Sequence, residues 1–239
     1  MTSTHEIDQQ RQLIRPLLAP THPEDALTAY YALMHDPRRT QLTLHLTPTG
    51  RAVGFVAVCQ TGQDLFVPLT VVRAPRLAAG DLLRQALSPR RPYRVISRLS
   101  LQAIIQQTLL VAEQQINRVY TLDASTFRRV INVMVQPGDA PFRFEIRSRD
   151  DERVVAAAGV NWYSDKMAEL YVYVEPGVQN RGWGRAVAAS SATALLEAGL
   201  LPLYIVAGEH TASQRLAYAL GFRDSGVREF ECRGQLREC

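Results

Sequence analysis

The stretch VQNRGWGRAV, residues 178–187, decides the fold. Two glycines, Gly182 and Gly184, stand one residue apart where an alanine-rich helical segment begins. Glycine inside a helix costs about 1 kcal/mol relative to alanine, so the pair predicts that another group comes close to the backbone. The first amides of a helix have no partner within it and carry the positive end of its dipole. With Arg181 and Arg185 beside them, these amides predict a pyrophosphate site.

Two common phosphate-binding patterns do not fit this stretch. The P-loop requires a glycine directly before a lysine, and the single lysine, Lys166, follows an aspartate. The dinucleotide pattern GxGxxG requires a third glycine where Val187 stands. The shorter pattern Q-x-x-G-x-G remains, with Gln179 at its start and a predicted strand and helix on either side of it.

The remaining elements follow from apolar periodicity and turn residues. In the first half we expect strands at 40–46, 53–59 and 65–72, a helix at 77–87, a solvated loop at 89–94 and a longer helix over 101–116. In the second half we expect strands at 118–122, 142–146, 154–162, 167–174, 203–206 and 227–232, with helices at 182–198 and 211–220. We also expect a helix that holds Phe127, Val130, Ile131 and Met134, capped by Asp123 or Ser125, and a turn at 136–139.

The two halves share an order of strand, turn, strand, strand and helix, which indicates a degenerate repeat. We therefore predict a mixed α/β fold in two domains, residues 1–115 and residues 116–239. In the first half the segment RAPRLAAG, residues 73–80, stands where the second half has VQNRGWG. It has no glycine pair at a helix start, so the first domain is expected to lack the anion site.

Composition limits the classes of protein that this chain can belong to. It has 239 residues, 46% of them hydrophobic, which is typical of a globular protein. No apolar run reaches the roughly 18 residues that a membrane helix needs, and the N-terminus lacks the pattern of a signal peptide. Three widely spaced cysteines, Cys59, Cys232 and Cys239, favour free thiols over a metal site or a disulfide framework. We expect a cytoplasmic protein without metal.

The stretch 169–187 resembles the acetyl-CoA-binding strand and loop of the GNAT acetyltransferases, whose loop motif is R/Q-x-x-G-x-G/A. HTASQRLAYALGF, residues 210–222, resembles the family's second signature, an asparagine, a serine and a helix ending Leu-Gly-Phe. The resemblance covers about residues 117–232, and the first half matches only as a faint second copy. It implies a GNAT-like fold with a splayed central sheet, in two tandem GNAT-like halves.

The resemblance also implies the residues that bind acetyl-CoA, the co-substrate. Strand backbone would pair with the pantetheine arm, loop amides would hold the pyrophosphate, and residues at the start of the last helix would contact the pantetheine. These three groups are Val172, Tyr173 and Val174; Gln179, Asn180, Arg181, Gly182, Trp183, Gly184 and Arg185; and His210 and Ser213. For Trp183 packing at the helix start is the alternative, and for His210 a loop position without a role.

Two residues are the candidates for proton transfer. The acceptor amine must be neutral to attack, and a lysine-like amine has a pKa near 10.4, so a base is needed. Glu169, near the start of the cofactor strand, is the candidate base; an exposed ion-pair partner is the alternative. The family's usual acid, a tyrosine in the last helix, falls at Ala217 here. Tyr218 lies one residue later, about 100° around the helix, and Ser213 or a water is the alternative.

Three functions are compatible with these features. The first is an acetyl-CoA-dependent N-acetyltransferase that acts by direct attack of a small-molecule or peptide amine, as a monomer or homodimer. The second is a non-catalytic acyl-CoA-binding regulatory module, suggested by Ala217. The third is a nucleic-acid binder, which rests only on the net charge of +4. The arginines are scattered among acidic residues, so we expect neither nucleic acid nor a membrane as a partner.

Overall fold

A computed structural model describes residues 4–62 and 64–238. Its internal contacts divide the chain into two compact units, the described residues of Met1–Asn117 with Arg228–Cys239, and Arg118–Val227. The first boundary lies two residues after the predicted one. The C-terminal segment, predicted in the second domain, belongs to the first unit instead.

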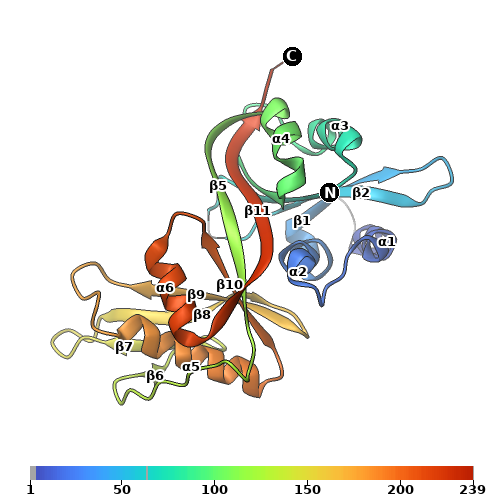
Figure 1. Cartoon of the computed structure of the whole chain (residues 1–239). Coiled ribbons are helices and arrows are strands. Elements are labelled where there is room, and N and C mark those ends of the chain that lie inside the picture. The colour runs from blue at the N-terminus through green and yellow to red at the C-terminus, as the bar shows by residue number, and fades with distance from the viewer. Residues whose placement is uncertain (1–3, 63, 239) are drawn as a thin grey trace. The chain divides into compact units, whose positions relative to one another are not determined.

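Within the described residues, the first unit holds four α-helices and six strands or parts of strands. Its elements are α1 (Thr4–Ile14), α2 (Pro23–Ala29), β1 (Thr40–Leu46), β2 (Ala52–Cys59), β3 (Leu69–Arg73), α3 (Arg76–Ala86), β4 (Tyr93–Arg98), α4 (Gln102–Thr108), the first part of β5 (Leu109–Leu122) and the second part of β11 (Phe222–Leu236). Short 3₁₀ turns lie at Arg15–Leu17, Pro37–Arg39 and Leu99–Leu101, and a π-helical turn lies at Tyr30–Met34. Helices α3 and α4 pack on one face of its sheet, against Val56, Val95 and Phe230 (Figure 1).

The second unit is built around one alanine-rich helix. Its elements are β6 (Gln136–Pro137), β7 (Phe144–Arg147), β8 (Val154–Tyr163), β9 (Met167–Val174), α5 (Trp183–Glu197), β10 (Leu201–Ala207), α6 (Thr211–Leu220) and the first part of β11 (Phe222–Leu236). Together with the last part of β5, its strands have the order β11-β5-β10-β9-β8-β7-β6. Small residues such as Ala188 and Ala192 let α5 lie close to the sheet and bury its face.

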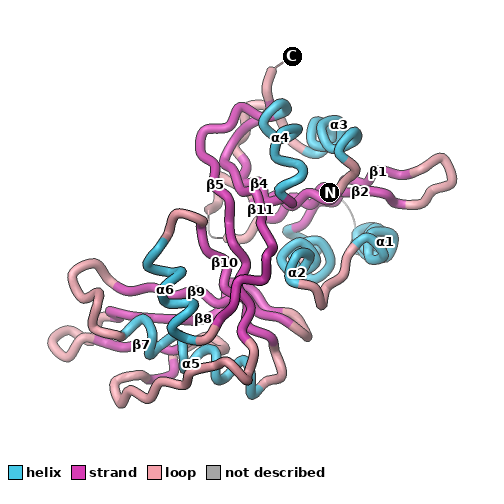
Figure 2. Tube along the Cα trace, in the orientation of Figure 1, coloured by secondary structure: helices cyan, strands magenta, loops and turns pink. Residues whose placement is uncertain are grey.

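The element order of the repeat is confirmed. The order β1-β2-β3-α3-β4-α4-β5 recurs as β7-β8-β9-α5-β10-α6-β11 (Figure 2). The ends of α5 and α6 also agree with the prediction, because Gly199 and Gly221 follow them with positive φ.

The last strand of each repeat does not pair with the strand before it in sequence. In the first unit β4 pairs antiparallel with β11, from Glu229 opposite Arg98 to Gly234 opposite Tyr93. In the second unit the neighbour of β10 is β5. Both β5 and β11 therefore contribute residues to both units, which is why the C-terminal segment is part of the first one.

Two predicted helices are wrong. The helix expected over 101–116 ends at Thr108, and the chain continues as the long strand β5. The segment 124–135 forms no helix, because its backbone bonds elsewhere: Thr126 N–H donates to Asp123 O, and Arg128 N–H donates to Leu220 O at the end of α6. Asp123 does accept from Ser125 N–H, but it caps a turn.

The stretch 89–94, expected to be a solvated loop, is only partly one. Tyr93 and Arg94 begin β4, Tyr93 is buried, and Arg94 forms an ion pair with Glu231. Pro89 and Pro92, which are typical of a loop, lie shortly before the strand and hid its start from the sequence pattern.

The free thiols agree with the prediction where the structure describes them. Cys59 and Cys232 are buried and unbridged, and burial raises the pKa of each thiol to about 12. Cys239 lies outside the described residues. Within the described part of the chain, no helix is long and apolar enough to cross a membrane.

Candidate functional site: a groove where two parallel strands part

The site begins where β9 and β10 separate. These parallel strands pair only at Met167–Leu201, Ala168–Pro202 and Glu169–Leu203. Strand β9 continues to Val174 with β8 on its other side, so its edge towards β10 is open beyond Glu169. An open strand edge presents unpaired amide and carbonyl groups that an extended ligand can pair with.

The opening is a groove of about 490 Å³ within the second unit. Its walls come from the end of β9, the loop before α5, the middle of β10 and the first turns of α6. It is lined by all twelve residues predicted to bind the cofactor, namely Val172, Tyr173, Val174, Gln179, Asn180, Arg181, Gly182, Trp183, Gly184, Arg185, His210 and Ser213. Four further residues, Val178, Tyr204, Ala212 and Leu216, line it too. The structure brings the predicted set together, while its role in binding stays a prediction.

The loop before α5 is held in an unusual backbone conformation. Gly177, Asn180 and Gly182 have φ values of 92°, 64° and 76°. Glycine adopts this left-handed region freely, and asparagine tolerates it better than most residues. The helix then begins at Trp183 without a side-chain cap, and its first backbone bond runs from Ala186 N–H to Gly182 O. The amides before Ala186 are therefore not used by the helix.

The two glycines serve different purposes. A Cβ on Gly182 would meet nothing within 4 Å, so this residue is needed for its positive φ and borders open space. A Cβ on Gly184 would lie 2.8 Å from Val174 Cγ2, so this residue lets α5 pack against β9. The sequence pattern assigned both to the approach of a phosphate, and for Gly184 packing is the stronger reason.

The loop also places positive charge at the groove. The Arg181 guanidinium lies 5.2 Å from the centre of the Trp183 ring, a cation–π contact. Trp183 itself is half-buried against the core of the unit, which agrees with the packing alternative. Arg185 is exposed on the first turn of α5. Both arginines can reach an anion at the helix start.

The opposite wall is organised by the start of α6. His210 is the N-cap residue, and its Nδ1 accepts from Ser213 N–H at 3.3 Å. Tyr204, which the sequence interpretation did not single out, is a buried groove residue on β10, one position after the last pair with β9. Burial raises the pKa of its phenol, and a hydrogen bond with the Ser213 side chain opposes that rise. A tyrosine in a short buried strand carries no sequence signal that separates it from a packing residue.

Glu169 lies beside the groove, at the last pair between β9 and β10, and does not line it. Its carboxylate accepts a hydrogen bond from Asn161 Nδ2 at 2.8 Å and another from Trp162 Nε1. Asn161 and Trp162 follow each other in β8, so in a regular strand their side chains would point to opposite faces. The pairing register with β9 shifts between Val160 and Trp162, and this bulge lets both side chains reach the Glu169 carboxylate. The carboxylate is thus held in one orientation.

Tyr218 is not brought to the groove. Its side chain is 53% exposed, contacts the Tyr120 ring edge-on at 5.5 Å, and lines a different hollow with residues 125–128. The preceding residue, Ala217, is buried in the core. Because Tyr218 is one residue later than the position of the family's tyrosine, its hydroxyl points away from the other predicted site residues.

A metal site is not part of this arrangement. Among the described residues, no group of three His, Cys, Asp or Glu side chains is placed to hold an ion.

Comparison with known proteins agrees with this geometry. Residues 146–231 match the model of the family "FR47-like protein". No curated protein matches the sequence.

Several solved structures share the fold over nearly the whole chain. One is a GCN5-related N-acetyltransferase from Sphaerobacter thermophilus, with 12% identity, a TM-score of 0.64, and 99% of this chain and 94% of that one covered. Another is a GNAT-family acetyltransferase from Colwellia psychrerythraea, with 12% identity, a TM-score of 0.58, and coverage of 99% and 98%. A third is a tandem GNAT protein from the clavulanic acid biosynthesis pathway, with 11% identity, a TM-score of 0.60, and coverage of 98% and 95%. The chain therefore shares the fold of these GNAT acetyltransferase structures, and its residues 146–231 are similar to the FR47-like family.

Proposed function

We propose that the second unit is an acetyl-CoA-dependent N-acetyltransferase that acetylates a primary amine. The observation that carries the proposal is the meeting of two features in one groove: an open strand edge on β9 and an uncapped helix start at Trp183. An extended amide-rich chain suits the first feature, and a pyrophosphate suits the second. Acetyl-CoA contains both, and it supplies the acetyl group as a thioester.

The groove residues fit this co-substrate in three places. Backbone groups of Val172 to Val174 would pair with the pantetheine arm. The amides from Asn180 to Arg185 and the two loop guanidinium groups would hold the pyrophosphate. His210 already uses Nδ1 to cap α6, so its Nε2 is the ring atom left for the pantetheine.

Glu169 is the proposed base. Its carboxylate would take a proton from the acceptor amine, directly or through a water, because only the neutral amine attacks. The fixed contacts with Asn161 and Trp162 keep the oxygens in place between turnovers. Tyr171 and Tyr173 follow on the same face of β9 by alternation, so this face is where we place the acceptor.

Tyr204 is the proposed proton donor, in place of Tyr218. Its phenol lies in the groove beside Ser213, whereas Tyr218 lies outside it. Tyr204 Oη is protonated at neutral pH, because the ordinary pKa of a phenol is near 10 and burial raises it further, so this group has a proton to give to the leaving sulfur. The missing tyrosine at Ala217 would then not prevent catalysis.

An acceptor screen tests the proposal. The full chain is incubated with acetyl-CoA and a panel of polyamines, amino acids, aminoglycosides and peptide N-termini, and released thiol is measured. Burial of Cys59 and Cys232 keeps their contribution to the thiol signal low. Amine-dependent thiol release is expected for at least one class. Tight coenzyme A binding without release for any amine would favour the non-catalytic module.

The proposal includes the setting of the reaction. It places the enzyme in the cytoplasm, as a monomer or homodimer, with a small-molecule or peptide amine as its partner and with neither nucleic acid nor a membrane.

A further inference from the structure

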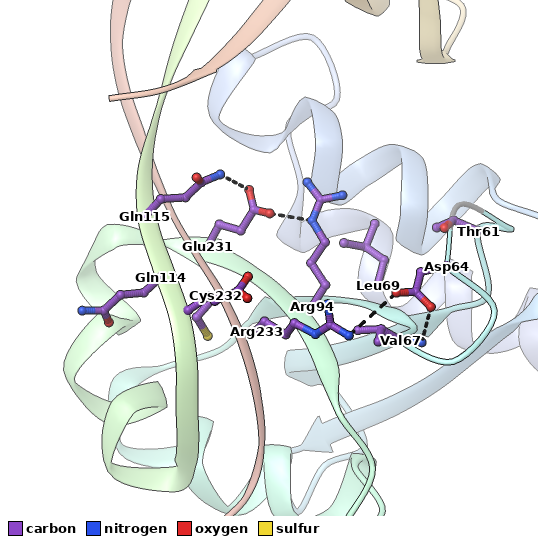
Figure 3. Close-up of a pocket in the computed structure, with 11 residues that line it drawn as sticks. Thr61, Asp64, Val67, Leu69, Arg94, Gln114, Gln115, Glu231, Cys232 and Arg233 are labelled. Atoms are coloured by element: carbon purple, nitrogen blue, oxygen red, sulfur yellow. Dashed lines mark hydrogen bonds and ion pairs between the residues drawn. The ribbon is translucent and has the colours of Figure 1, made fainter. Parts of the chain in front are cut away.

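The first unit contains a hollow of its own, of about 360 Å³, on the face of its sheet near the start of β4 (Figure 3). It is formed by the strands β3, β4, β11 and β5 and by the loop between β2 and β3. All of its lining residues belong to the first unit, so it is separate from the groove. Its volume is within the range of small-ligand pockets.

Two arginines lie side by side in this hollow. Arg94 and Arg233 are direct partners in the antiparallel pairing of β4 and β11, so both side chains are on the same face. Like charges opposite each other destabilise a sheet unless something compensates them. We therefore expect either an anion that neutralises these two arginines or a function that requires them to lie together.

Compensation is complete for Arg94. Its Nε donates to Glu231 Oε1 at 2.5 Å, and the other oxygen of Glu231 accepts from Gln115 (Figure 3). That oxygen also accepts from Asn117 Nδ2. Burial alone would raise the pKa of Glu231, but these donors bring it below its ordinary value. The Glu231 carboxylate is thus fully used inside the protein.

Arg233 lacks such a partner. Its one ion pair among the described residues is with Asp64 Oδ2, at 3.9 Å, which is too long for a hydrogen bond. The other oxygen of Asp64, Oδ1, accepts from the amides of Phe66 and Val67, so this carboxylate is held in the loop and its Oδ2 stays at that longer distance from Arg233. Glu113, on the neighbouring strand β5, also lines the hollow. Within the described chain its side chain makes no ion pair or hydrogen bond.

The hollow therefore offers a guanidinium that has only a long ion pair with Asp64, a carboxylate of Glu113 without a partner among the described residues, and an apolar wall of Val67 and Leu69. We propose that it binds a free α-amino acid with an uncharged side chain. The ligand carboxylate would bind Arg233, the ligand ammonium would bind Glu113, and the side chain would lie against the apolar wall. The site is independent of acetyl transfer in the second unit.

Calorimetry on the full chain, without acetyl-CoA, tests the proposal with the standard amino acids. At least one with an uncharged side chain is expected to bind one site per chain. Its N-acetyl derivative and its amide, which each lack one charge, should bind about tenfold more weakly or worse. Absence of binding across the whole panel, or equal binding of either derivative, overturns the proposal.

Variants identify the site. Glu113→Gln and Arg233→Gln should each weaken binding by about tenfold or more. Arg90→Gln, which changes an exposed arginine outside the hollow, should leave it unchanged. Glu113 is exposed, so its variant tests the proposal even if Arg233→Gln lowers the melting temperature. The groove variant Gly182→Asn should bind the amino acid normally; loss of binding there would assign it to the groove and contradict the proposal.

Discussion

Asp25 Oδ1 lies 2.8 Å from Arg73 Nη2, at the end of β3 in the first unit. The same carboxylate bonds Arg98, which ends the neighbouring parallel strand β4, at 3.1 Å. In the second repeat the equivalent strands β9 and β10 have parted before their ends, and a groove begins there. In the first, β3 and β4 stay paired from Leu69 to Val72, and an internal carboxylate joins their ends.

Asp25→Ala should destabilise the first unit strongly. The Asp25 side chain is 5% exposed, and its removal leaves Arg73 and Arg98 without their shared anion. The free energy of unfolding should fall by about 3 kcal/mol, measured by denaturant titration. The matched control on the same helix is Glu24→Gln, because Glu24 pairs with Arg98 at a more exposed position and should contribute less than about 1 kcal/mol. Equal losses from both would contradict this account.

Coenzyme A should bind once per chain. Pairing of β3 with β4 from Leu69 to Val72 leaves no groove between these two strands, and the segment before α3 has no glycine pair. Calorimetry of the full chain with acetyl-CoA measures the stoichiometry. A value of two would show that the first repeat also holds a cofactor site.

Gly182 and Gly184 should respond differently to substitution. Gly182→Asn keeps a residue that tolerates positive φ but adds a side chain beside the helix start. It should lower acetyl-CoA affinity by about tenfold or more with little change in melting temperature. Gly184→Val should instead lower stability by about 1–3 kcal/mol, since its Cβ overlaps Val174. If Gly184→Val melts like the wild type and only binding is lost, then both glycines serve the ligand.

Proton transfer should depend on Glu169 and Tyr204 and not on Tyr218. Glu169→Gln should reduce turnover by about 10²-fold, less at high pH where more of the amine is neutral. Tyr204→Phe should lower kcat with little change in acetyl-CoA affinity, while Tyr218→Phe should change the rate less than about threefold. Steady-state kinetics on variants with wild-type melting distinguishes these effects. A large loss from Tyr218→Phe alone would return the acid role to α6.

Acid should weaken the attachment of β11 within the first unit. The pKa of Glu231 is lowered in the folded state, so its stabilisation is present above the ordinary glutamate range, near 4.3, and is lost as pH falls through the lower folded value. At pH 7, Glu231→Gln should therefore be less stable by about 1–3 kcal/mol, and the gap should close below about pH 4. Thermal melting across this range measures it. The control Glu238→Gln, in an exposed pair with Arg90, should show no such closing gap.

The sequence by itself determined the elements from 167 to 222. Strand β9 and helix α6 have the predicted bounds, α5 is within one residue of them at each end, and all twelve predicted cofactor residues line one groove. These elements depend on local signals: alternation, glycines at helix ends and a helix start without a cap. Because the groove residues come from two short contiguous segments, local structure alone nearly assembles them.

Only the tertiary structure decided the rest. Leu109 to Ile116 has helical spacing, yet it forms part of a long strand because pairing with other strands outweighs local propensity. The segment after Asp123 bonds to the end of α6 and is not a helix for the same kind of reason. The exchange of β5 and β11, the closure of the first repeat by Asp25 and the position of Tyr204 all depend on contacts between residues far apart in the chain. No pattern within a short window of sequence contains such contacts, so they appear only when the chain is folded.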